Sequence, residues 1–381
     1  MWVRPGSFPG AAAAGRNRRP PTISMSYDHE HSDETFCEVN KSSTSAIADT
    51  ESAQAKATKP ETRSRKWLER VKSFAPLLAL LVLSLLIGLL NPRFFDFFNF
   101  VRIANSAAIP LVLALGATFV ILLGSVDLSV EGILALGAVV VAILVRNDMN
   151  QNSFGWTAPI FAIIAGAAIG FLNGFVHVRV RIPSFMVTLG SWFVGIGLST
   201  LILGGRNARV LDPEIRSLAL TRFFNFPLAV WVALGVLVFA WLIERFTIFG
   251  RHVLAIGGGE DLAVLSGIHV NRVKVLVFTL AGAFYGIGGV LAAAQLGQGN
   301  ATIGDGRLFS TITAVVVGGT SLSGGAGGVL NTLVGVLIIA VLGNGMVLLG
   351  ISPDIQQAVQ GIIIIIAVAS SIDRNRMKFV K

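Results

Sequence analysis

Long apolar stretches dominate the chain from residue 74 onward, and short polar or charged segments separate them. A helix needs about 20 apolar residues to cross the hydrocarbon core of a bilayer, with some variation around that length. The pattern predicts an all-α integral membrane protein with about ten transmembrane helices. The expected spans are 74–90, 106–124, 130–146, 156–176, 185–204, 227–243, 273–296, 308–320, 328–349 and 355–371.

The eighth stretch, 308–320, is too short for a simple span, and glycines interrupt it. Irregular backbone persists at membrane depth only where protein or a water-filled cavity satisfies its polar groups. We therefore expect a broken or re-entrant helix there. Two segments that lie between expected spans also echo each other weakly, Gly-Ser-Val-Asp-Leu-Ser at 124–129 and Gly-Gly-Thr-Ser-Leu-Ser at 318–323.

The two ends of the chain differ from this apolar body. Residues 1–62 are rich in Ala, Ser, Thr, Pro and charge, so they cannot bury enough apolar surface to offset their ordering entropy. We expect a disordered cytoplasmic tail at 1–62, a polytopic domain at 63–371 and a basic cytoplasmic tail at 372–381. Met25 is an alternative start. The run Asp-His-Glu-His at 28–31 is read as a solvated tail, because no further ligands lie near it.

Charge and cysteine content narrow the class of protein. Only 13% of the residues are charged, whereas soluble domains usually have about 25%. The net charge of +9 is spread over both tails and the apolar body, which argues against a nucleic-acid surface. Cys37 is the only cysteine, so neither an intrachain disulfide nor a cysteine-rich metal site is expected, and no cofactor or metal is implied.

Basic residues set the expected orientation, because cytoplasmic segments near membrane spans carry an excess of Lys and Arg. With the amino end inside, the cytoplasmic segments collect most of the basic residues, and an even number of spans returns the carboxyl end to the cytoplasm. We expect a multi-pass inner-membrane protein with both termini cytoplasmic. The expected inner set is Arg63, Arg65, Lys66, Arg70, Lys72, Arg179, Arg181, Arg245, Arg251, Arg272, Lys274, Arg374, Arg376, Lys378 and Lys381.

Motifs of catalysis are absent from the sequence. No Gly-Lys pair occurs, so a phosphate-binding P-loop is excluded, and neither a His-Glu-x-x-His run nor a Gly-x-Ser-x-Gly elbow is present. The segment 322–326, Leu-Ser-Gly-Gly-Ala, is similar to the signature loop of ATP-binding-cassette (ABC) ATPases, but it lies between apolar stretches in a chain without a P-loop. We expect no enzymatic activity.

Glycines recur at helical spacing in two expected spans, at Gly166, Gly170 and Gly174 and at Gly282 and Gly286. Small residues let helix backbones approach closely in lipid. Packing within one chain and a seam between two copies both fit this pattern.

The segment 244–272 is the most informative of the expected cytoplasmic segments. Three glycines at 257–259 break the chain, and acidic residues follow where a helix amino terminus favours negative charge. Leu262, Leu265 and Ile268 repeat at a spacing of three, and Gly267 suits a helix end. This short amphipathic helix either lies in a groove of a partner protein or covers the chain's own helix ends.

Neutral polar residues within the expected spans, together with two residues at the 124–129 break, are candidates for a translocation path. Each also suits a hydrogen bond to a neighbouring helix, and Asp127 also suits an interfacial turn. The candidates are Asp127, Ser129, Asn173, Gln295, Asn331, Asn344 and Gln360.

Several motifs, in order along residues 75–371, resemble the permease subunits of ribose/xylose-type ABC sugar importers. They are 124–129, 182–190 (Ile-Pro-Ser-Phe-Met-Val-Thr-Leu-Gly), 204–206 (Gly-Gly-Arg), 265–268 (Leu-Ser-Gly-Ile), 272–274 (Arg-Val-Lys), 314–325 (Ala-Val-Val-Val-Gly-Gly-Thr-Ser-Leu-Ser-Gly-Gly), and 356–357 (Gln-Gln) before 361–364 (Gly-Ile-Ile-Ile).

The resemblance implies a type II-like importer transmembrane domain that translocates a sugar by alternating access. It also implies a dimer with a second copy or a paralogous permease, a cytoplasmic ABC ATPase subunit, and a periplasmic binding protein facing the outer loop 205–226. The segment 257–268 matches the family's coupling region. The residues expected to contact the ATPase are Glu260, Asp261, Ala263, Leu265, Ser266 and Gly267.

Two departures from the family pattern bear on the substrate. Glu131 replaces a usual glycine, and Arg-Leu-Phe-Ser at 307–310 stands where the family often has Tyr-Glu-Leu-Asp. A pentose, a hexose or a polyol therefore fits as well as ribose. Two other classes remain open, an ion-coupled secondary transporter and a membrane scaffold that transports nothing. The first needs ion-binding carboxylates at the midplane, and the second leaves the coupling-like segment unexplained.

Overall fold

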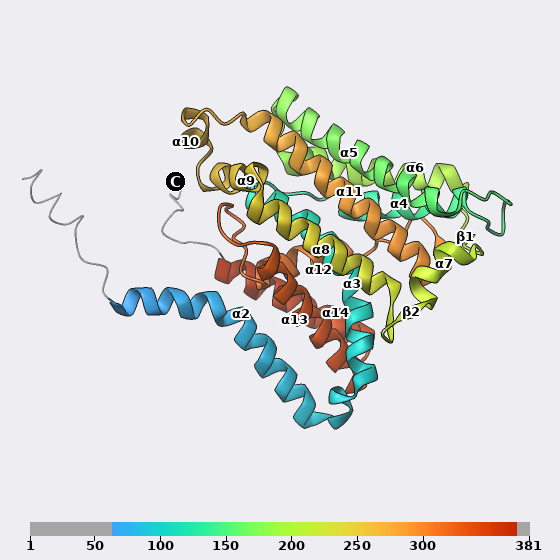
Figure 1. Cartoon of the computed structure of the whole chain (residues 1–381), viewed down its shortest axis with the longest axis horizontal. Helices are drawn as coiled ribbons and strands as arrows, with labels where there is room; N and C mark the ends of the chain where they lie inside the picture. Colours follow the sequence, from blue (N-terminus) through green and yellow to red (C-terminus); the bar gives the residue numbers. More distant parts are fainter. Residues whose placement is uncertain (1–62, 372–381) are drawn as a thin grey trace, which may run out of the picture. The chain divides into compact units, whose positions relative to one another are not determined.

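Each of the ten expected spans corresponds to an apolar helix in the computed structural model, which describes residues 63–371 (Figure 1). The predictions for residues 1–62 and 372–381 lie outside the described residues. Among the described residues, six helices are long and apolar enough to cross a membrane, and four others have shorter apolar stretches, at Phe74–Leu90, Val130–Leu144, Arg307–Val317 and Pro353–Ile366. The long helices are α3 (Phe97–Leu122), α5 (Ala158–Val180, preceded by the 3-10 turn η2, Gly155–Thr157), α6 (Ser184–Leu203), α8 (Leu228–Phe246), α11 (Val270–Leu296) and α13 (Val329–Leu348). The others are α2 (Arg63–Leu90), α4 (Val130–Leu144), α12 (Arg307–Val317) and α14 (Pro353–Ser371).

Short elements occupy opposite ends of the long helices α8 and α11. Helices α9 (Ile248–Gly258) and α10 (Glu260–Leu265) lie between the end of α8 and the start of α11. Helix α7 (Pro213–Leu220) and strand β1 (Ala208–Arg209), which pairs with β4 (Gln298–Gly299), lie at the other end (Figure 1). Strands β2 (Arg222–Phe223) and β3 (Phe226–Pro227) form a hairpin there, and the 3-10 helix η1 (Pro92–Phe95) joins α2 to α3. We call these the α10 end and the α7 end.

Glycines let α5 and α11 pack with their backbones almost in contact. A Cβ atom added to Gly174 would lie 2.7 Å from Cα of Val275, and one added to Gly286 would lie 2.7 Å from the carbonyl oxygen of Ala162. Gly166 and Gly170 face Gly282 in the same way. Of the two interpretations of these glycines, the structure therefore shows packing within the chain.

Burial is uneven around the helices. Helices α3 and α11 form the centre of the fold, whereas large apolar side chains stay exposed on α2, α5, α6 and α14, such as Leu85, Phe171, Phe193 and Ile365. Contiguous exposed apolar surface of this kind is rare on soluble monomers, and it is expected where helices face lipid.

The chain between α3 and α4 is extended and runs inside the helix bundle. The backbone N–H groups of Val126 and Leu128 donate to the hydroxyls of Ser184 and Thr188 on α6, at 3.2 and 3.0 Å. Asn173, about two turns from the end of α5, donates to Ser129 at 3.2 Å, which places Ser129 about 10 Å inside that helix end. Segment 123–129 thus enters the bundle from the α10 end, and α4 begins at depth.

Helix α12 begins close to the same point but approaches from the α7 end. The loop before it passes along α4, where a Cβ atom added to Gly304 would lie 2.7 Å from the carbonyl oxygen of Glu131. The side chain of Glu131 then accepts a hydrogen bond from the backbone N–H of Leu308 at 2.9 Å. The amino termini of two short helices therefore meet inside the bundle, and a carboxylate of one satisfies a free N–H of the other. The prediction of a broken eighth span is confirmed.

Candidate functional site

The candidate coupling residues all lie on α10 or on the turn that ends it. Ala263 is buried within the protein, whereas Glu260, Asp261 and Leu265 are exposed. Gly267 adopts a positive φ of 79° after the last helical turn, and Ser266 is exposed beside it. The sequence pattern predicted one short helix with a glycine end, and α10 has that form, although it ends at Leu265, before Ile268 of the predicted apolar face.

Apolar side chains project from α10 away from the rest of the chain. Leu265 is 84% exposed and Leu262 is 69% exposed, although Ile268 is half-buried against the protein. A six-residue helix with two exposed leucines is unstable in isolation, because short helices depend on packing. Its exposed surface suits a partner in contact with α10.

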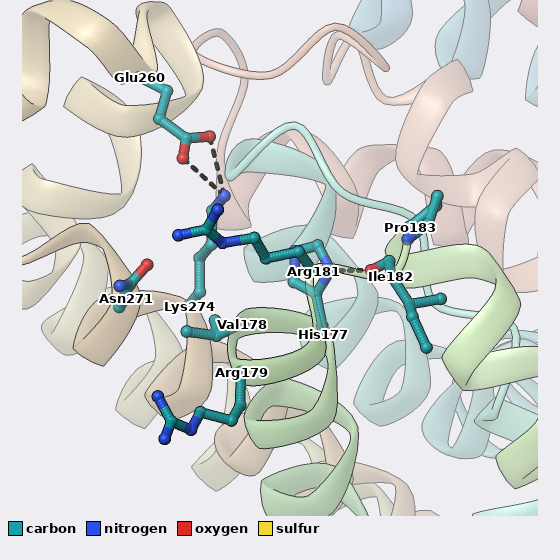
Figure 2. A pocket seen from close by; sticks show the side chains of 9 residues that line it. All are labelled: His177, Val178, Arg179, Arg181, Ile182, Pro183, Glu260, Asn271 and Lys274. Carbon is teal, nitrogen blue, oxygen red and sulfur yellow. Dashed lines mark hydrogen bonds and ion pairs between the residues drawn. The ribbon is translucent and has the colours of Figure 1, made fainter. Parts of the chain in front are cut away.

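An ion pair anchors the first turn of α10. Nζ of Lys274, on α11, contacts both carboxylate oxygens of Glu260 at 2.8 Å (Figure 2). The lysine side chain is only 14% exposed, so the pair is partly shielded from solvent. The position of α10 is therefore tied to the start of the long helix α11.

Glycines also join the α9–α10 connection to two distant segments, and we call Gly124, Gly257, Gly258, Gly324 and Gly325 the glycine junction. A Cβ atom added to Gly324 would lie 2.8 Å from Cα of Gly124 and 3.1 Å from Cα of Gly257, and the N–H of Gly325 donates to the carbonyl of Leu122 at 2.9 Å. The segments 124–129 and 318–323, which echo each other in sequence, therefore lie next to each other. Gly124 begins the first segment, and Gly324 directly follows the second. No side chain separates these backbones, so the connection between α9 and α10 lies in direct contact with the end of α3 and with the 318–328 loop.

A cleft toward the α7 end lies among α3, α12, α13 and α14. It consists of two adjoining cavities of about 380 and 700 Å³ that share Ser310, Gln356 and Gln360, and we call it the amide cleft. Arg102, Ser106 and Asn344 add polar groups on one side, and Asp305 and Gln357 on the other. The size matches the pockets that usually hold small molecules, and amides and hydroxyls suit neutral hydroxylated ligands.

Below the cleft, toward the α10 end, the same helices close against one another. The hydroxyls of Thr118 on α3 and Thr332 on α13 hydrogen-bond at 2.6 Å, and both side chains are fully buried. A Cβ atom added to Gly318, at the end of α12, would lie 2.7 Å from the carbonyl carbon of Asn331. The cleft therefore ends at a packed layer.

The structure brings together some of the seven candidate path residues and separates others. Asn344 and Gln360 line the amide cleft, although Asn344 also exchanges hydrogen bonds with Asn99 at 3.0 and 2.9 Å. Gln295 instead donates to Asn105 at 3.1 Å, and the half-buried Asn331 lies beside the end of α12.

The other three candidates form a separate buried network. Both the backbone N–H and the hydroxyl of Ser129 donate to Asp127, at 2.8 and 2.6 Å, and Asn173 connects Ser129 to Ser191. Asp127 is 5% exposed and lies inside the bundle rather than in an interfacial turn. Its hydrogen bonds hold the extended segment 123–129 at the start of α4.

Sequence reasoning did not select Ser310 and Gln356 as path residues. Gln356 and Gln360 are one turn apart on α14, and that spacing of amides is a signal that the sequence contains. Ser310 lies in the segment 307–310 that departs from the family pattern, but nothing in that segment indicates a cleft formed with α14.

Residues 99–368 match the model of the family described as branched-chain amino acid transport system / permease component. The chain belongs to this permease family. It is a membrane-spanning component of a transport system and not an enzyme.

Curated relatives cover most of the permease. It is 35% identical to the ribose import permease protein RbsC of Escherichia coli (strain K12) over 309 residues, which are 80% of this chain and 94% of that protein. It is 36% identical to RbsC of Bacillus subtilis (strain 168) over 80% of this chain and 94% of that one. The chain is 31% identical to the galactose/methyl galactoside import permease protein MglC of E. coli (strain K12), over 80% of this chain and 95% of that protein. No solved structure matches the permease.

Proposed function

We propose that this permease carries a sugar or a polyol across the bacterial inner membrane as the membrane subunit of an ATP-driven importer. The relatives named above import ribose and galactose by name. The observation that carries the proposal is the placement of an amide-lined cleft and an exposed short helix at opposite ends of one helix bundle.

The amide cleft is the proposed passage for the solute in its outward-facing half. Amides and hydroxyls bind sugar hydroxyls without charge, and weak contacts allow release. Among the positions that depart from the family pattern, Glu131 and the backbone of Leu308 bond to each other instead of lining the cleft, whereas Phe309 and Ser310 do line it. The groups shared by both cavities, Ser310, Gln356 and Gln360, are uncharged, and Arg102 and Asp305 carry opposite charges on its two sides. The cleft therefore supports a neutral polyhydroxylated solute and leaves its identity open.

The proposed assembly has three further parts. A cytoplasmic ABC ATPase subunit contacts α10 through Leu262 and Leu265, and a periplasmic binding protein docks on the loop 205–226. A second copy of the chain, or a paralogous permease, completes the membrane domain. Both termini lie in the cytoplasm, so the α10 end faces inward. ATP binding and hydrolysis in the partner then move α10 and shift the balance between outward and inward states.

Leucine-to-aspartate variants at the two ends test the ATPase contact. Leu265→Asp puts a charge on the proposed contact surface, and losing one buried leucine should weaken ATPase binding about tenfold or more. Leu220→Asp, at an exposed leucine of the α7 end, is the matched control and should bind the ATPase normally. ATPase binding by the two variants is measured by co-purification.

Two results would contradict the proposal. Normal ATPase binding by Leu265→Asp would remove α10 as the contact. Uptake by the permease alone, without the ATPase but with an ion gradient, would identify a secondary transporter instead.

A further inference from the structure

A basic pocket lies beside α10, between the end of α5 and the start of α11. Its volume is about 540 Å³, and its lining includes Arg179, Arg181, Asn271 and Lys274 (Figure 2). One acidic residue, Glu260, lines it as well and is paired with Lys274. Within the described residues neither arginine forms an ion pair or a side-chain hydrogen bond, so two guanidinium groups remain available to an anion.

Arg181 occupies a backbone conformation that arginine rarely adopts. Its φ of 62° and ψ of 31° are left-handed, and this is the position after α5 where glycine is common. Strain of this kind persists where surrounding structure holds it and is frequent at binding sites. Here the imidazole of His177 and the carbonyl of Ile182 hydrogen-bond at 2.6 Å across the turn that contains Arg181, and Arg181 lines the pocket (Figure 2).

The surface next to the pocket is apolar and exposed. Val180, Phe185 and Met186 flank the arginines, and each is at least 45% exposed. The rings of Phe171 and Phe175, both on α5, stack on each other and are also exposed. A basic pocket directly beside apolar surface matches the two parts of a phospholipid, whereas a soluble phosphate would need only the charges.

We propose that this pocket binds the phosphate headgroup of an anionic phospholipid, such as phosphatidylglycerol. The acyl chains lie along the exposed faces of α5 and α6, and the phosphate contacts Arg179 and Arg181. The assignment to the inner leaflet rests on the proposed orientation, but headgroup binding itself does not depend on transport. Because Lys274 also holds Glu260, the lipid lies next to the anchor of α10.

Lipid retention by the purified full chain tests this site. Wild type in detergent is mixed with phosphatidylglycerol or phosphatidylcholine, and the bound lipid is measured by native mass spectrometry. Wild type should retain phosphatidylglycerol preferentially. Each basic residue near an anionic headgroup strengthens binding about fivefold, so Arg179→Gln combined with Arg181→Asn should weaken retention about 30-fold.

Three controls separate charge from folding and from position. Asparagine tolerates the left-handed conformation, so the fold should persist in the double variant. Arg181→Lys keeps the charge and should retain the lipid. Arg251→Gln removes an exposed arginine of α9 that does not line the pocket, and it should bind lipid like wild type.

Three outcomes would overturn the proposal. One is equal retention of phosphatidylglycerol by the double variant and wild type. A second is displacement of the lipid by millimolar inorganic phosphate, which would identify a site for a soluble anion. The third is a double variant that keeps the lipid but no longer co-purifies with the ATPase, which would assign the pocket to that partner.

Discussion

The glycine junction and the amide cleft lie toward opposite ends of the same helices and are built in opposite ways. At the junction, backbones of three distant segments approach so closely that no side chain fits between them. At the cleft, the helices separate and leave two adjoining cavities lined by polar side chains. Close packing transmits displacement because packed interfaces are not continuously deformable. The difference indicates that one region passes on movement and the other accommodates a solute.

Gly257 and its neighbour Gly258 offer the sharpest test of the junction. A Cβ atom on Gly257 would lie 2.5 Å from the amide nitrogen of Gly325, whereas one on Gly258 would meet nothing within 4 Å. Overpacking of this kind costs about 1–3 kcal/mol, which corresponds to about 5- to 150-fold in a two-state equilibrium. Gly257→Ala should therefore reduce ATP-dependent uptake by such a factor. Gly258→Ala should transport normally.

Uptake in proteoliposomes, corrected for the amount of folded protein, measures this difference. Equal transport by the two alanine variants would show that close packing at the junction has no part in coupling.

A smaller effect is expected in the amide cleft. Gln360→Leu replaces the amide with an apolar side chain of nearly the same size. The loss of one hydrogen bond to the solute should lower uptake about 2- to 10-fold. ATP hydrolysis by the assembled complex should change less than uptake, because the junction is intact. The control is Gln151→Leu, the same substitution in an exposed loop.

Uptake and ATP hydrolysis measured on the same proteoliposomes separate the two regions. If Gln360→Leu transports like Gln151→Leu, the solute does not contact the amide cleft.

Hydropathy predicted the number and order of the apolar helices, because a helix that faces lipid needs a continuous run of apolar residues, which the sequence shows directly. Helix ends were less accurate. The second span was expected at 106–124, but α3 begins at Phe97, since the polar residues Asn99, Arg102 and Asn105 interrupt the apolar run without interrupting the helix. Helix α9 was not predicted separately, because Gly250 and Arg251 make 248–258 look like a loop.

The sites were predicted unequally for a physical reason. The residues of α10 are contiguous in sequence, so their spacing alone indicated a short amphipathic helix. The amide cleft brings Ser310 of α12 and Gln356 of α14 to one cavity, and no local sequence pattern records such a meeting of distant helices. The depth of Asp127 was also not evident, because an extended segment inside a bundle depends on hydroxyls supplied by Ser184 and Thr188 of another helix.

The most direct test of the central claim is the side of the membrane that each region faces. In a Cys37→Ser background, the chain has no other cysteine, so Leu265→Cys and Gln357→Cys each provide a single label site. Intact spheroplasts are treated with a membrane-impermeant maleimide. We expect Gln357→Cys to be labelled directly and Leu265→Cys only after the membrane is permeabilised. Labelling of Leu265→Cys in intact spheroplasts would contradict the account.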